Sequence, residues 1–218
     1  MLLGVPDGPH LSRTTSFNPQ AIKLIFSSPR LRASACGYFG HMWELYTLWA
    51  FAPLLLLVYA DRLQLHINLS WWTFLFIAAG TIGCIGGGLL SIRRGSARVA
   101  FWQLAISGSC CLLAPLMLET SPLLFIGFML LWGICVAGDS PQFSAMNADY
   151  APREYVGSAL TIINSLGFLL SALSIQLAGF LLPLLSIQYL FWILLPGPIL
   201  GLWALAPLYR QARRGDSA

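Results

Sequence analysis

Six long apolar stretches, separated by short polar connections, run along most of the chain. They cover residues 34–59, 71–92, 99–118, 122–147, 155–182 and 184–209. A helix needs about 20 mostly apolar residues to cross the hydrocarbon core of a bilayer, and each stretch meets that length. The pattern therefore predicts an all-α polytopic membrane protein, with a domain of six transmembrane helices over residues 34–209.

The composition excludes a water-soluble protein. Hydrophobic residues make up 57% of the chain and charged residues 9%, whereas about 25% of a soluble domain is charged, and the mean hydropathy is +0.74. The net charge of +4 does not indicate a nucleic-acid partner, because most arginines adjoin the ends of the apolar stretches, where anionic lipid and the insertion machinery act on them. The lipid bilayer is the expected partner.

Positive charge alternates from one connection to the next. With the N-terminus inside the cell, only Arg62 of the 12 Lys and Arg residues lies outside. Cytoplasmic connections are enriched in Lys and Arg, so the sequence predicts that both termini are cytoplasmic. The inside set is Arg13, Lys23, Arg30, Arg32, Arg93, Arg94, Arg98, Arg153, Arg210, Arg213 and Arg214.

The segments outside the apolar stretches carry patterns of their own. Residues 1–16 are rich in Gly, Pro, Ser and Thr and are expected to be disordered. Residues 17–33 are assigned to a cytoplasmic amphipathic helix on the membrane surface, with Asn18 as N-cap, Pro19 at its first position and a run to about Ser28 that Pro29 stops. Residues 210–218 are expected to form a basic cytoplasmic tail.

Three residues that can carry charge near neutral pH lie inside the apolar stretches: His41, Glu44 and Asp139. An acid in mid-membrane costs about 2.5–3.5 kcal/mol on insertion scales, so such residues usually face a bundle interior or a wet cavity. Counted along their helices, the two acids fall at similar depths. His41 lies three positions before Glu44 on one helix face, where the pair can hydrogen-bond and hold a proton. The alternative is structural, with His41 only satisfying Glu44, or with Glu44 bonded to a polar group of a neighbouring helix. Asp139 would then bond to Ser140 near a helix break at Pro141.

Two stretches contain stripes of small and polar residues. Gly80, Gly83 and Gly87 lie in the second stretch, the last two at the four-residue spacing that lets helix backbones approach closely in lipid. We expect these glycines to pack against another helix. In the fifth stretch Asn164 is a candidate for a substrate pathway or for a helix contact, because an amide in lipid needs a partner.

The sequence shows no pattern of soluble catalysis and none of metal or cofactor binding. It has no glycine-rich nucleotide loop, paired-histidine zinc motif or nucleophile elbow in the context each requires. The five cysteines form no CxxC pair and are typical of buried packing residues. We expect a protein that is not an enzyme and that holds no metal and no cofactor.

Three parts of the sequence resemble a known family. Residues 37–46 are similar to the opening of the seventh helix in bacterial members of the major facilitator superfamily. Residues 88–95 are similar to the family's glycine-flanked basic loop between paired helices, and residues 139–144 with 151–160 are similar to its tenth helix and the loop into the eleventh. Over residues 17–210 the chain therefore resembles the C-terminal six-helix half of such a transporter.

The resemblance implies two cytoplasmic gate loops, although both depart from the family pattern. Ile92 stands where the family usually has an acid, and Val156 stands where many relatives carry Arg. Both changes remove a charge, so the charge network that stabilises one conformation in the family is weakened here. The candidate gate residues are Gly88, Arg93, Arg94, Gly95, Pro152, Arg153 and Gly157.

The resemblance also implies an architecture and an activity. Six helices would form two inverted three-helix repeats, with the first helix of each repeat lining a central cavity, and Glu44 and Asp139 lie on those two helices. The implied activity is that of a bacterial inner-membrane transporter that moves a small molecule or ion by alternating access. His41 and Glu44 are then contacts for a proton or the substrate, and Asp139 is a cavity or gate residue.

A complete transporter of this family has twelve spans, so the resemblance implies a partner, either a separately encoded second half or a second copy of the chain. A lone half would leave the polar face around Glu44, Asp139 and Asn164 against lipid, at a cost on the order of several kcal/mol. The alternatives are a truncated product without transport activity and a non-transporting membrane scaffold whose glycine stripes bind partner helices.

Overall fold

The computed structural model describes residues 20–215 of the chain. Over that range it is helical and contains no strand. Its elements are α1 (Gln20–Ser27), α2 (Pro29–Arg62), α3 (Leu69–Arg94), α4 (Ser96–Met117), α5 (Pro122–Gly138), α6 (Ser140–Tyr150), α7 (Val156–Leu181), α8 (Ile187–Leu190), η1 (Phe191–Leu194) and α9 (Pro196–Gly215). The predicted disordered tail, the first three residues of the predicted surface helix and the end of the predicted basic tail lie outside the described residues.

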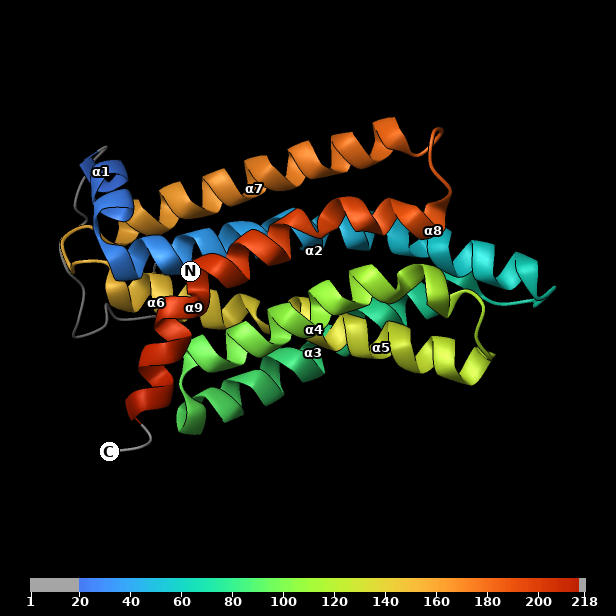
Figure 1. Cartoon of the computed structure of the whole chain (residues 1–218), viewed down its shortest axis with the longest axis horizontal. Helices are drawn as coiled ribbons and strands as arrows, with labels where there is room; N and C mark the ends of the chain where they lie inside the picture. Colours follow the sequence, from blue (N-terminus) through green and yellow to red (C-terminus); the bar gives the residue numbers. More distant parts are fainter. Residues whose placement is uncertain (1–19, 216–218) are drawn as a thin grey trace, which may run out of the picture.

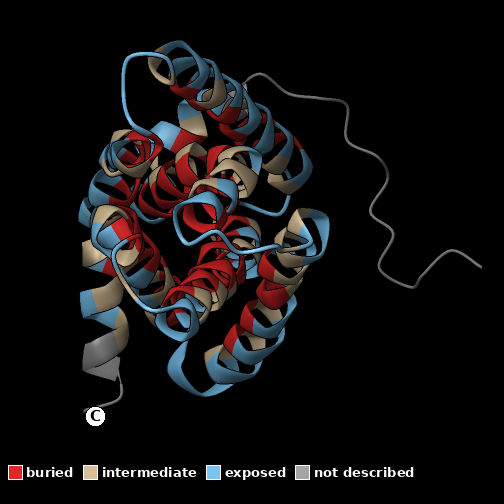
Figure 2. Cartoon of the chain, turned by 90° about the vertical axis from the view of Figure 1, so that its right-hand side faces the viewer, coloured by how far each residue is buried: buried red, intermediate tan, exposed pale blue. Residues whose placement is uncertain are grey.

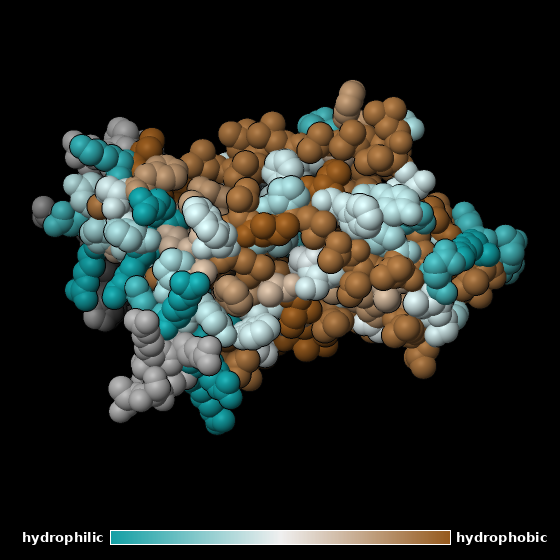
Figure 3. Space-filling view, viewed as in Figure 1, coloured by the Kyte–Doolittle hydropathy of each residue, from teal (hydrophilic) through white to brown (hydrophobic). Residues whose placement is uncertain are grey.

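Within the described residues, six helical segments are long and apolar enough to cross a membrane. Four are the single helices α2, α3, α4 and α7, whereas α5 and α6 together make the fourth span, and α8, η1 and α9 make the sixth. Figure 1 shows the spans running along one axis, with α1 and the C-terminal end of α9 at the same end of the bundle. The surface is mostly hydrophobic through the middle and hydrophilic at both ends (Figure 3). The prediction of an all-α membrane protein with six transmembrane helices is confirmed.

The first span begins earlier than the apolar pattern indicated. Helix α1 ends at Ser27, and Pro29 stands at the start of α2, where its missing N–H leaves no helical hydrogen bond unmade. Residues 29–33, at the end of the segment assigned to the surface helix, are therefore part of α2. Within α1, Ile25 is fully buried against the bundle and Ile22 is exposed.

Helix α2 lies at the centre of the packing, against α6, α7 and α9. It approaches α9 through a pair of glycines. A Cβ atom on Gly40 would lie 2.3 Å from the carbonyl oxygen of Gly197, and one on Gly197 would lie 2.6 Å from that of Gly40. Only glycine allows the two backbones to come this close, and such contacts are typical of helices that pack in lipid.

The buried apolar side chains form two clusters along the length of the bundle. On α2, one cluster uses residues between Leu31 and Met42, on the side of α1, and the other uses residues between Leu45 and Tyr59. Viewed end-on, the buried residues line the inner faces of the helices and the exposed residues face outward (Figure 2). The spans thus surround a core that is divided into two parts.

Local features explain where the helices turn. The side chain of Asn68 accepts a hydrogen bond of 3.0 Å from the backbone N–H of Trp71 and so caps the start of α3. Gly95 joins α3 to α4 with a φ of 81°, a conformation that favours glycine. Helix α9 bends in its C-terminal part (Figure 1), as expected for a helix with Pro207 inside it. Tyr209 then stacks on Phe101 of α4, with ring centroids 4.3 Å apart.

Candidate functional site

Polar side chains lie between the two apolar clusters, near the middle of the bundle. We call this set the polar layer. All its members are at most 3% exposed: His41 and Glu44 of α2, Ser107 of α4, Asp139 between α5 and α6, and Ser171 and Ser174 of α7. Their positions between the clusters place the two acids at similar depth, although the acids contact different neighbours.

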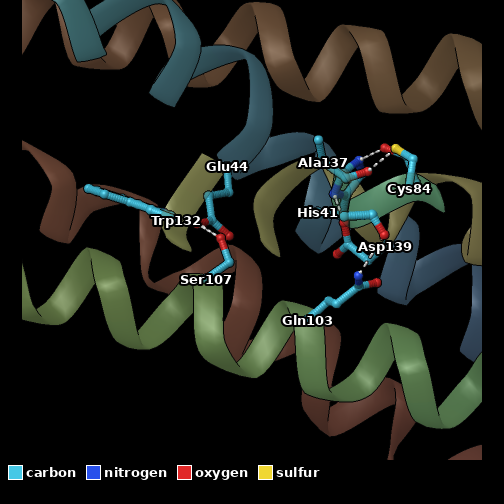
Figure 4. Close-up of polar contacts among 10 residues, drawn as sticks. His41, Glu44, Cys84, Gln103, Ser107, Trp132, Ala137 and Asp139 are labelled. Atoms are coloured by element: carbon cyan, nitrogen blue, oxygen red, sulfur yellow. Dashed lines mark hydrogen bonds and ion pairs between the residues drawn. The ribbon is translucent and has the colours of Figure 1, made fainter. Parts of the chain in front are cut away.

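Glu44 is held by two other helices (Figure 4). Its Oε1 atom accepts hydrogen bonds from the hydroxyl of Ser107, from Sγ of Cys111 at 3.3 Å, and from Nε1 of Trp132 at 3.2 Å. Its Oε2 atom has no hydrogen-bond partner among the described residues. The indole N–H of Trp132 can only donate, so the three hydrogen bonds stabilise negative charge on Oε1. A proton on Glu44 would therefore reside on Oε2.

The polar partners of His41 are Asp139 and Ser140, and those of Glu44 are other residues. Nδ1 of His41 lies 2.9 Å from Oδ1 of Asp139, and Nε2 lies 2.7 Å from Oγ of Ser140. Both ring nitrogens are therefore engaged by the junction between α5 and α6, which fixes the orientation of the ring.

The fourth span is broken at Asp139, with Pro141 in the first turn of α6. A proline at this position removes the N–H that would otherwise bond to the carbonyl of Ala137 four residues earlier. That carbonyl instead accepts a hydrogen bond of 3.4 Å from Sγ of Cys84 on α3 (Figure 4). The break proposed from Pro141 in the sequence is present, and a side chain from another span satisfies it.

Hydroxyl groups of the polar layer attach α7 to α2. Oγ of Ser171 donates to the carbonyl oxygen of Met42 at 2.6 Å, and Oγ of Ser174 donates to that of Trp43 at 2.7 Å. Thr47 donates to Oγ of Ser174 at 2.8 Å. The acceptors, Met42 and Trp43, lie between His41 and Glu44 in the sequence. A movement of α7 would therefore displace the backbone that carries these two ionisable residues.

Asn164 lies outside the polar layer. It is exposed on α7, and its side chain has no recorded hydrogen bond within residues 20–215. Thr161, Ser165 and Gln176 are exposed on the same helix. The structure therefore does not bring Asn164 together with His41, Glu44 and Asp139.

The glycines singled out for packing lie where α3 meets α5. A Cβ atom on Gly83 would stand 1.9 Å from the carbonyl oxygen of Ile134, and one on Gly80 would stand 2.6 Å from Cβ of Ala137. Gly87 is also tight, because its Cβ atom would approach Nε2 of Gln103 to 2.9 Å. The neighbour of α3 at these three positions is therefore another helix of the same chain.

The candidate gate residues occupy two turns at the end of the bundle that carries α1. Arg93, Arg94 and Gly95 are exposed at the α3–α4 turn. Pro152 and Arg153 are exposed at the α6–α7 turn, which is closed by a hydrogen bond of 2.8 Å from the N–H of Tyr155 to the carbonyl of Pro152. Gly88 and Gly157 adjoin these turns on α3 and α7.

His41, Glu44 and Asp139 are each at most 1% exposed. In the described part of the chain no group of three His, Cys, Asp or Glu side chains could hold a metal ion. The polar layer is closed in this conformation. It can store protons and hold helices together, and access to it requires the helices to move.

Sequence reasoning missed the partners that define each site. Ser107 and Trp132 were not singled out, and Ser140 was considered only as a partner of Asp139, although each is a polar or amphipathic residue within an apolar stretch. A search for every hydrogen-bonding side chain inside the predicted spans would have found them. Their pairing with Glu44 or His41 would still have required the arrangement of the helices.

The sequence matches the family model of the Major Facilitator Superfamily over residues 34–218. A comparison with curated proteins found no similar sequence. The family match covers most of the chain, and the six membrane-length helices fit one half of a transporter of this kind. The chain is therefore a multi-pass integral membrane protein that belongs to the major facilitator superfamily of transporters.

Proposed function

We propose that the chain is one six-helix unit of a solute transporter that works by alternating access, and that a second six-helix unit completes the transport path. The observation that carries the proposal is the polar layer. It holds two acids and a histidine between two apolar clusters in the middle of the bundle. Ionisable residues inside membrane spans are costly and are typical of proton relays and substrate pathways.

The helix contacts support an arrangement as two inverted repeats. Helix α2 packs against α7 and α9, and the broken α5–α6 span packs against α3 and α4. If the first, second and third spans are exchanged for the fourth, fifth and sixth, the contacts of the first span with the fifth and sixth become the contacts of the fourth span with the second and third. This is the relation that inverted three-helix repeats require. His41 and Glu44 then lie on the first helix of one repeat, and Asp139 lies on the first helix of the other.

The exposed face of α7 supports the presence of a second unit. Thr161, Asn164, Ser165 and Gln176 are exposed on a helix that spans the membrane. An amide without a hydrogen-bond partner is unfavourable in lipid, whereas polar side chains stabilise contacts between helices there. The second unit is either a separately encoded half or a second copy of this chain.

The proposed proton sites are Glu44 and the pair formed by His41 and Asp139. A proton on Oε2 of Glu44 neutralises the acid without disturbing the three hydrogen bonds to Oε1. A proton on Asp139 removes its charge and weakens its contact with His41, which releases α6 from α2. Coupling of protonation to helix movement in this way would drive alternating access.

The distribution of charge supports an orientation with both termini in the cytoplasm. The α3–α4 and α6–α7 turns, which carry Arg93, Arg94 and Arg153, lie at the same end as α1 and the C-terminal end of α9. At the opposite end Arg62 pairs with Glu119. Positive charge gathers on the cytoplasmic side of membrane proteins, and the bacterial inner membrane is the proposed location.

Proton movement in reconstituted vesicles tests this function. Vesicles loaded with a pH-sensitive dye receive the chain alone or together with a candidate partner, and neutral, anionic and cationic small solutes are added under a proton gradient. We expect proton entry that depends on one class of solute and that Glu44→Gln reduces by about tenfold. Asp149→Asn is the matched control, since Asp149 is an exposed acid of α6. Equal proton entry in the Glu44→Gln variant would remove Glu44 from the proton path.

A non-transporting scaffold is the second candidate, and the closed state of the polar layer favours it. A cysteine at Ser140, in a variant without the five native cysteines, separates the two functions. Ser140 is only partly buried and contacts His41. A transporter that opens will expose this cysteine to a water-soluble thiol reagent at a rate that changes with pH. A scaffold will leave it unlabelled at every pH.

A further inference from the structure

A cavity of about 570 Å³ lies between α3 and α4 and is separate from the polar layer. It extends from the α3–α4 turn toward the middle of the bundle, from Arg94 to Ile82 along α3. These two residues are about 18 Å apart at helical rise, comparable with the roughly 15 Å of hydrocarbon in one leaflet. The cavity therefore has the depth of one leaflet.

Apart from Gln103, the inner walls of the cavity are apolar. Ile82, Gly86 and Leu90 follow each other at intervals of four residues and form one face of α3, and Trp102 and Ile106 line the opposite wall on α4. Gly86 differs from its neighbours Gly83 and Gly87 because a Cβ atom placed on it would meet no atom within 4 Å. Helix packing does not explain this glycine, whereas a large side chain at this position would project into the cavity.

The end of the cavity near the turn is basic and aromatic. Arg94 and Arg98 line it, and none of its lining residues within the described chain is acidic. Trp102, which is 56% exposed, and Tyr209 stand beside the two arginines. Trp and Tyr are typical of the headgroup level of a membrane, and Arg side chains there attract anionic headgroups.

We propose that this cavity binds one anionic phospholipid. Arg94 and Arg98 contact the phosphate, for which the guanidinium fork is well shaped. Trp102 and Tyr209 lie against the glycerol region, and one acyl chain fills the space that Gly86 leaves open. The bound lipid joins α3 to α4 at their cytoplasmic ends, independently of whether the polar layer carries protons.

Thermal unfolding of the full chain in a neutral detergent tests the ligand class. The probes are a phosphatidylglycerol, a phosphatidylcholine with the same acyl chains, and inorganic phosphate. We expect a saturable rise of the midpoint with the phosphatidylglycerol alone. An equal rise with the phosphatidylcholine would overturn selection by charge, and a rise with inorganic phosphate would show that a free anion is the ligand.

Two pairs of variants locate the site, with bound lipid counted by native mass measurement so that loss of stability is not confused with loss of binding. Arg94→Gln should weaken binding of the phosphatidylglycerol by about tenfold, whereas Arg153→Gln, which changes an exposed arginine at the α6–α7 turn of the same end, should change it by less than about twofold.

The second pair tests the acyl-chain site. Gly86→Leu should prevent binding, and Gly127→Leu, on an exposed face of α5 with no atom within 4 Å of its Cβ position, should not. Equal effects within either pair would overturn the proposed site.

Discussion

Nδ1 of His41 lies 2.9 Å from Oδ1 of Asp139, and this contact joins the central helix α2 to the break between α5 and α6. Both side chains are about 1% exposed. Removing one partner leaves the other as a buried polar group without this contact, which costs about 1–3 kcal/mol. The break in the fourth span is therefore held by a contact that a single substitution can remove.

Asp139→Ala is expected to lower the free energy of unfolding by about 1–3 kcal/mol, as measured by titration with a denaturing detergent. Asp149→Ala is the control, because Asp149 is exposed on α6 and its loss should change stability by less than about 0.5 kcal/mol. The double variant with His41→Ala should cost less than the sum of the two single changes. Additive costs would show that the two residues do not interact.

The indole of Trp132 is expected to stabilise the fold through its hydrogen bond to Glu44. Trp132→Phe keeps most of the ring and removes the donor, so it should cost about 1.5–3 kcal/mol if Glu44 is ionised. In a Glu44→Gln background the same change should cost less. Trp203→Phe, at a residue that is 79% exposed, should have little effect. A cost for Trp132→Phe that does not depend on residue 44 would contradict the hydrogen bond.

Two glycine substitutions of the same chemistry should have opposite effects. Gly83→Ala places a methyl group 1.9 Å from the backbone oxygen of Ile134, so α3 and α5 must separate, at a cost of about 1–3 kcal/mol. Gly127→Ala meets no atom within 4 Å and should gain up to about 1 kcal/mol from helix propensity. Thermal unfolding in detergent compares them, and a Gly83→Ala variant as stable as Gly127→Ala would refute the contact.

The pair formed by Arg62 and Glu119 should make stability depend weakly on pH. Glu119 lies in the turn between α4 and α5, outside the membrane-spanning segments. The hydrogen bonds from Arg62 lower the pKa of its carboxyl group. Because this pKa lies below the unfolded value of about 4.3, the stabilisation is complete above that value and is lost as the pH falls through the folded-state pKa. Both side chains are largely exposed, so the contribution is small.

Glu119→Gln should therefore lower the midpoint of thermal unfolding slightly at neutral pH and leave it unchanged in strong acid. Asp61→Asn, at an exposed acid of the same end of the bundle, controls for the loss of one charge. If the difference in unfolding midpoint between Glu119→Gln and the unmodified chain grew as the pH fell, the stabilising effect of the pair would be contradicted.

The six spans could be predicted from the sequence because a chain in lipid must satisfy its backbone internally, which makes long apolar stretches helical. The start of α2 could not be placed, since Arg30 and Arg32 end the apolar pattern although the helix continues through them. The face shared by His41 and Glu44 follows from helical spacing. That each residue turns to a different neighbour does not, because the partners lie 63 to 99 residues away in the sequence.

The glycine stripe of α3 shows the same limit at a finer scale. Spacing predicted close packing at Gly83 and Gly87, and the structure has another helix at both. Gly86 lies between them in the sequence and faces open space. The sequence does not distinguish a glycine that packs against a helix from one that lines a cavity, because the difference depends on the separation of α3 and α4.

The number and direction of membrane crossings test the six-span topology most directly. They can be measured by side-specific labelling of single cysteines in a variant without the five native ones. The positions are Ser186 and Glu119 at one end of the bundle and Arg153 at the other, all exposed. We predict that an impermeant thiol reagent labels cysteines at 186 and 119 in intact cells, and labels a cysteine at 153 only after the membrane is opened. Labelling of 186 and 153 from the same side would contradict the six-span topology.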